Sequence, residues 1–257
     1  MAGYFSHQEP SNEFLSAATG AMSVIGLFAP AIIALWMSWS NPELWKDLKK
    51  RAISLKGINP TYLAITVLFM PASILLAQAI SLLFGYSSEQ FHFAAKFSGF
   101  SAGIFPGWFM IFLAPMVEEL GWHTYGTDCL RQRMNLFFTS VLFAVYWAFW
   151  HVPLSSIKNY YHSNVAHSGL LYSVNFMVSI IPFVILMNWL YYKTRRNILV
   201  AIIFHTTAGV FNELFNTHPD SKVIQTGILI VISIILVAKE KGFFFQLGYR
   251  ETSNVQG

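Results

Sequence analysis

Two adjacent glutamates, Glu118 and Glu119, stand in a segment that is otherwise apolar. They are the only residues with a formal charge between Phe97 and Thr127. An ionised carboxylate at membrane depth costs at least a few kcal/mol, so such residues usually face a polar cavity and act there. We therefore treat this pair as the first candidate for chemistry.

Two further apolar stretches each contain one histidine, His151 and His205. Carboxylates and imidazoles are the groups that most often move protons in hydrolysis. Trp147 precedes His151 by one helical turn, and His123 follows Glu119 by one turn, a spacing at which an acid and a base pair on one helix face. This set of groups predicts an intramembrane hydrolase.

The same residues could also have purely structural roles. The glutamates point about 100° apart on a helix, so one would act and the other would position it. Both could instead lie at a hydrated helix end. His151 could be an interfacial residue in an aromatic belt, since Tyr146 and Trp150 lie near it in the sequence.

The composition places these residues in a membrane protein. Of 257 residues, 55% are hydrophobic and 11% are charged, and the mean hydropathy is +0.50. A soluble domain carries about 25% charged residues. The single cysteine, Cys129, excludes an intrachain disulfide and a multi-cysteine zinc site. We expect residues 1–257 to form one integral membrane domain.

Charge-free runs predict an all-α transmembrane bundle of about seven spans. The first five runs reach the ~20 residues that a spanning helix needs. Prolines inside spans kink a membrane helix without excluding it. The predicted spans are 14–41, 60–85, 97–117 continuing into the glutamates, 135–157, 169–192, 197–212 and 223–238.

Arginine and lysine placement predicts the orientation. They gather in alternate connections, at 46–56, 131–133, 193–196 and after 238, whereas the N-terminal segment has none. The positive-inside rule then places the N-terminus outside and the C-terminus in the cytoplasm. We assign the net charge of +4 to these loops and to anionic lipid, not to nucleic acid. Segment 45–56 is predicted to be an interfacial amphipathic helix, and the expected location is the cell membrane, specifically a bacterial inner or plasma membrane.

Four short segments, in this order, resemble the motifs of a known family. Residues 118–125, 130–133, 147–154 and 204–205 resemble the CAAX protease and bacteriocin-processing family, also called Abi or CPBP. This family comprises relatives of the type II CAAX prenyl endopeptidases. The resemblance covers about residues 100–215, the expected catalytic core.

The resemblance implies a role for each matching residue. Glu118 would activate water with help from His151, Glu119 would be the supporting carboxylate, and His205 would stabilise the oxyanion. Such enzymes cleave a peptide or membrane protein, in some cases a lipidated one, with no cofactor required. We expect the cavity to open to the cytoplasm. Bacterial members are linked to bacteriocin processing or self-immunity.

Two positions depart from the family pattern. The motif arginine is His123 here, and the asparagine expected one turn after His205 is Gly209. Loss of an oxyanion donor typically costs ~10²–10³ in turnover. Asn175 or Asn212 could supply an amide instead. The alternative is an inactive family member that acts as a binding or immunity protein.

A metal-dependent version uses the same residues. Two histidines and a glutamate can ligate zinc and leave one position open for water. If zinc is bound, Glu118, His151 and His205 are the expected ligands.

Overall fold

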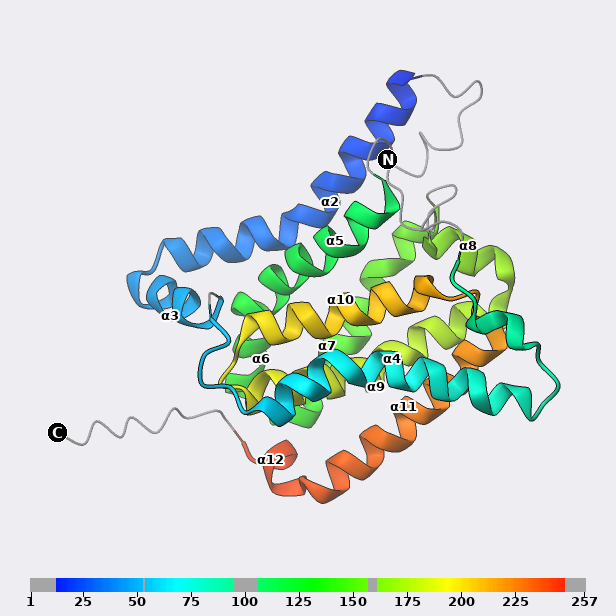
Figure 1. The fold of residues 1–257 in the computed structure, drawn as a ribbon. Coiled ribbons are helices and arrows are strands. Elements are labelled where there is room, and N and C mark those ends of the chain that lie inside the picture. Colours follow the sequence, from blue (N-terminus) through cyan, green and yellow to red (C-terminus); the bar gives the residue numbers. More distant parts are fainter. Residues whose placement is uncertain (1–12, 53, 95–105, 157–160, 248–257) are drawn as a thin grey trace.

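The computed structural model describes residues 13–52, 54–94, 106–156 and 161–247, and it is a bundle of helices (Figure 1). Each predicted apolar run contains a helix. The α-helices are α2 (Glu13–Trp39), α3 (Pro42–Ala52), α4 (Pro60–Leu82), α5 (Gly107–Gly121), α6 (Thr127–Arg133), α7 (Leu136–His151), α8 (Tyr161–Ser168), α9 (Leu170–Lys193), α10 (Ile198–Leu214), α11 (Pro219–Lys239) and α12 (Lys241–Phe245). Short turns of other helix types are η1 (Ser88–Phe91), η3 (Trp122–Gly126) and η4 (Val152–Ser156).

Five segments are long and apolar enough to cross a membrane. They are Gly20–Trp39, Pro60–Leu82, Leu136–Ser156, Leu170–Lys193 and Pro219–Lys239. The chain is therefore an all-α integral membrane protein, as predicted. Helices α5 and α10 are apolar but shorter, with 15 and 17 residues. The count of seven spans and the orientation of the termini remain predictions.

The third predicted span is displaced along the chain. Its first part, 97–105, lies outside the described residues, and the helix begins at Gly107. Helix α5 does not end at the glutamates: it continues through η3, which is one turn of π-helix, into α6. No proline lies between Glu119 and Arg133, where α6 ends, to stop the helix. Both glutamates consequently lie near the middle of a long helical segment.

Asparagine side chains fix the start of several helices. Asn135, Asn59 and Asn197 each accept a hydrogen bond from a backbone N–H in the first turn of α7, α4 and α10, respectively. Such caps satisfy N–H groups that have no partner within the helix. Two residues separate the end of α6 from the start of α7, and α7 packs against α6 and α9.

Helix α9 runs through the hydrophobic core between α7, α10 and α11. Its second half, from Ile180 to Tyr192, is almost entirely buried. Helix α2 packs against α5 from the other side. There Gly121 lies so close to Pro30 and Ala31 that an added Cβ would approach atoms of both residues to 3.0 Å.

The two ends of the bundle differ in composition. Helix α3, the end of α6, the α9–α10 turn and α12 lie at one end, which carries most of the arginines and lysines (Figure 1). Helix α8 and the α10–α11 turn lie at the opposite end (Figure 1). The predicted amphipathic segment 45–56 is helical as far as Ala52, where α3 ends.

Candidate functional site

A cavity of about 400 Å³ lies between α4, α5 and α7 to α11. Most of the residues predicted for the site line it, although they come from four helices. They are Glu118, Trp147, His151, Asn175, His205 and Asn212. The side chains of Glu119 and His123 lie behind this wall and are fully buried. Glu118, His151 and His205 therefore all line one cavity.

Trp147 is at the centre of this group. Its indole Nε1 donates a hydrogen bond to Oε2 of Glu118 at 3.1 Å. The rings of His205 and His151 lie against the same indole, with centroids 5.1 and 5.4 Å away. Because Trp147 is 2% exposed, it fixes the Glu118 carboxylate in one orientation at the cavity wall.

Glu119 joins two histidines from different helices. His205 Nδ1 donates to Oε1 at 2.8 Å, and His123 Nδ1 is bonded to Oε2. This confirms the predicted pairing of His123 with Glu119. The supporting carboxylate thus orients the His205 ring at the cavity.

His123 is held on its other side by Asn188. Its Nε2 lies 2.8 Å from Oδ1 of Asn188, whose amide nitrogen donates to Ser140. Both ring nitrogens of His123 thus lie against side-chain oxygen atoms, the kind of partner that an arginine at this position would also take.

His151 ends α7 and is oriented by its own helix. Its Nδ1 donates to the carbonyl oxygen of Trp147 at 2.7 Å. The ring lines the cavity and stacks on the ring of His162, with centroids 4.8 Å apart. The side chain therefore belongs to the cavity wall.

The sequence did not single out His162 as a site residue. It lies on the short helix α8, is 9% exposed, and packs against Phe176 as well as His151. Burial, together with the nearby His151, holds the pKa of His162 well below its usual range. A histidine in a polar segment gives no signal of this kind, because its burial depends on where α8 docks.

The proposed zinc ligands do not form a metal-binding set here. Among the described residues, no three histidine, cysteine, aspartate or glutamate side chains are placed to hold one ion. Glu118 is hydrogen-bonded to Trp147, and His205 is bonded to Glu119 through Nδ1.

The position of the cavity bears on the two predictions about sidedness. The cavity extends from the middle of the bundle to the end that carries α8 and the α10–α11 turn, where Tyr172, Glu213 and Lys222 line it. That end lies opposite the basic connections (Figure 1). If substrate enters the cavity at this end, the predicted cytoplasmic opening and the predicted cytoplasmic basic connections exclude each other. Both remain predictions.

Comparison with known proteins identifies the family. The family model described as type II CAAX prenyl endopeptidase, Rce1-like, matches residues 100–211. A protein named CAAX prenyl protease 2, from Methanococcus maripaludis, is 39% identical over 223 residues, which cover 86% of this chain and 82% of that protein. The resemblance found in the motifs is thereby confirmed. The chain belongs to the Rce1-like family of type II CAAX prenyl endopeptidases.

Proposed function

We propose that this protein is an intramembrane endopeptidase that cleaves prenylated proteins near their C-terminus. One observation carries the proposal. The Glu118 carboxylate, held by Trp147, faces the same cavity as His151 and His205. A positioned carboxylate and two imidazoles at the wall of one cavity are suited to activating water.

The proposed reaction is hydrolysis with Glu118 as general base. Glu118 removes a proton from a water molecule as the water oxygen bonds to the carbonyl carbon of the substrate. The C–N bond then breaks, and the leaving amine takes the proton from Glu118. His151, at the same wall, would help to orient the water.

His205 would stabilise the oxyanion of the tetrahedral intermediate. Because its Nδ1 donates to Glu119, it can offer a second hydrogen bond only when Nε2 also carries a proton. An anionic partner at Nδ1 favours that charged form of the ring. Glu119 would therefore act through His205 and not on the water itself.

The expected substrate is a prenylated peptide or protein. The relative from Methanococcus maripaludis is named a CAAX prenyl protease, and a CAAX motif carries its lipid on a cysteine three residues before the C-terminus. Apolar side chains such as Met110, Ile111, Phe176 and Phe183 line the cavity beside the polar groups. These surfaces suit a chain with an isoprenoid attached. We place the enzyme in the cell membrane.

The test is cleavage of a farnesylated peptide that has three residues after the modified cysteine and a free C-terminus. We expect cleavage by the wild type and at least a ~10³-fold loss in Glu118→Gln, which keeps the shape of the side chain but cannot take a proton. Glu89→Gln makes the same change at an exposed position and should leave the rate unchanged. Equal rates for the wild type and Glu118→Gln would refute the mechanism. Metal analysis of the purified protein would decide whether zinc contributes.

The second candidate function is that of an inactive binding or immunity protein. The observation that favours it is Gly209, which lines the cavity where the family carries an amide side chain. In that case the wild type would bind the farnesylated peptide without cleaving it. Peptide binding together with no cleavage over hours would make this function the better one.

A further inference from the structure

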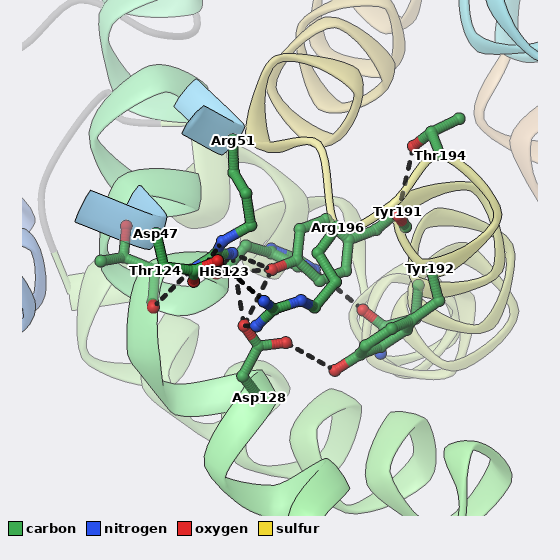
Figure 2. Close-up of polar contacts among 10 residues, drawn as sticks. Asp47, Arg51, His123, Thr124, Asp128, Tyr191, Tyr192, Thr194 and Arg196 are labelled. Atoms are coloured by element: carbon green, nitrogen blue, oxygen red, sulfur yellow. Dashed lines mark hydrogen bonds and ion pairs between the residues drawn. The ribbon is translucent and has the colours of Figure 1, made fainter. Parts of the chain in front are cut away.

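A ring of four charged side chains lies beneath the site, at the basic end of the bundle. Asp47 and Arg51 come from α3, Asp128 comes from α6, and Arg196 comes from the α9–α10 turn (Figure 2). Each arginine contacts both aspartates, at distances between 2.7 and 3.3 Å. The ring thus joins three elements that are far apart in the sequence.

Arg51 is the most buried member of the ring and reaches furthest into the bundle. It is 6% exposed, although it belongs to a short helix whose lysines are exposed. Its Nη1 donates to the carbonyl oxygen of His123 at 3.2 Å, and its Nη2 donates to that of Thr124 at 3.3 Å. Both carbonyls belong to the π-helical turn η3 (Figure 2).

These contacts hold the backbone that carries His123. A π-helical turn departs from the regular hydrogen-bond pattern of an α-helix and is often found at functional sites. Tyr191 strengthens the same point: its hydroxyl donates to the His123 carbonyl at 2.8 Å and accepts from Arg51 at 2.5 Å. The Tyr191 ring also lies against the His123 ring, with centroids 4.6 Å apart.

A continuous chain of contacts therefore leads from α3 to the cavity. Arg51 fixes the His123 backbone, the His123 ring is bonded to Glu119, and Glu119 orients His205. Nothing in the sequence motifs predicts this, because Arg51 precedes His123 by 72 positions and lies outside the matched segment.

We propose that Arg51 is a positioning residue for the reaction, acting through the π-turn on His123 and Glu119. This proposal rests on the proposed function, because Arg51 positions His123 and Glu119, and Glu119 orients His205 for catalysis. The guanidinium fork suits this role, because it can bond two carbonyls and two carboxylates at once from a fixed plane. A lysine at the same position has one compact donor group and cannot make all of these bonds.

The activity test compares Arg51→Gln, Arg51→Lys and Lys50→Gln. Lys50 is the next residue on α3 and is exposed, so its change is the matched control. We expect Arg51→Gln to lower kcat by ~10–100-fold, as misplacement of a catalytic group does, with KM within about threefold. Arg51→Lys should fall between Arg51→Gln and the wild type, and Lys50→Gln should match the wild type.

A double-mutant cycle with His123→Gln separates positioning from general stability. If Arg51 acts through His123, adding Arg51→Gln to His123→Gln should lower kcat by less than about twofold further. If kcat of the double variant falls by the product of the two single-variant losses, the proposal is overturned. An unchanged kcat in Arg51→Gln would also overturn it. If Arg51→Gln does not fold, the same cycle is run with Arg51→Lys.

A readout independent of activity keeps this proposal distinct from the proposed function. In protein labelled with ¹⁵N-histidine, the His123 ring signals, assigned by their loss in His123→Gln, should shift in Arg51→Gln and not in Lys50→Gln. An unshifted His123 signal would overturn the role of Arg51. Absence of peptide cleavage by the wild type, with the shift present, would overturn only the proposed function.

Discussion

Among single residues, Gly209 has the most direct consequence for turnover. It lies one turn after His205 on α10 and lines the cavity. The nearest atom to an added Cβ would be Cγ1 of Ile111 at 3.4 Å, so the wall has room for a side chain. An asparagine there could donate its amide N–H to the oxyanion of the intermediate.

We expect Gly209→Asn to raise kcat for the farnesylated peptide by ~10-fold or more, given what one oxyanion donor contributes. Gly242→Asn introduces the same side chain on α12, where an added Cβ meets no atom within 4 Å, and serves as the control. The gain should disappear when Glu118→Gln is added. A rate in Gly209→Asn equal to or below that of the wild type would show that the cavity does not need this donor.

His162 gives a prediction about stability and pH. Because burial holds the pKa of its ring well below the usual 6.5, the folded protein keeps the ring neutral in mildly acidic solution. The unfolded chain takes up a proton near pH 6.5. Stability from this residue is therefore complete above pH 6.5 and is lost as the pH falls below it, by at most about 1.4 kcal/mol per pH unit.

The measurement is the melting temperature in detergent at pH 7.5 and pH 5.5. The wild type should lose a few degrees more than His162→Phe, which keeps a ring that can stack on His151 and cannot titrate. His92→Phe makes the same change in an exposed loop and should behave like the wild type. Identical pH dependence in His162→Phe and the wild type would contradict the burial of this ring as the cause.

At the scale of helices, the close contact between α2 and α5 sets the position of the glutamates. Gly121 lies two residues after Glu119, and α2 approaches it with Pro30 and Ala31. The neighbouring atoms include backbone, which cannot move away as a side chain can. A methyl group at Gly121 must therefore push the two helices apart.

We expect Gly121→Ala to destabilise the protein by about 1–3 kcal/mol, the usual cost of overpacking. Gly126→Ala is the matched control in the same helical segment, since an added Cβ there meets nothing within 4 Å. That change should be neutral or slightly stabilising, because alanine restricts the unfolded chain. Thermal unfolding of both variants in detergent checks the difference, and equal melting temperatures would show that α2 does not press on α5.

For the molecule as a whole, the question is which end faces the cytoplasm. The positive-inside rule assigns the end with α3 and the α9–α10 turn to the cytoplasm. The cavity then extends toward the external end, where α8 and the α10–α11 turn lie. The alternation of basic connections is the only sidedness signal in the sequence, and we expect it to hold.

Labelling with a membrane-impermeant maleimide on intact cells tests this orientation. In a Cys129→Ser background, a cysteine at Asn216, which is exposed in the α10–α11 turn, should react. A cysteine at the exposed Lys50 on α3 should react only after the membrane is opened. The reverse pattern would place the basic end outside and would make the predicted cytoplasmic opening of the cavity correct instead.

The sequence alone determined the class of the protein, the positions of most of its apolar helices and the candidate residues Glu118, Glu119, His151 and His205. These features are local or compositional: burial in lipid requires long apolar runs, and a pair such as Glu119 and His123 meets because its spacing matches one helical turn. The family motifs lie in the same segments and could be recognised for that reason.

Only the tertiary structure decided how these residues are held. Trp147 binds Glu118, His162 stacks on His151, and Arg51 reaches the π-turn because helices distant in the sequence pack against each other. Helix packing depends on side-chain shapes along whole interfaces, and no spacing within one segment encodes it. The start of α5 and the direction in which the cavity extends could not be predicted from the sequence for the same reason. Both depend on where neighbouring helices end.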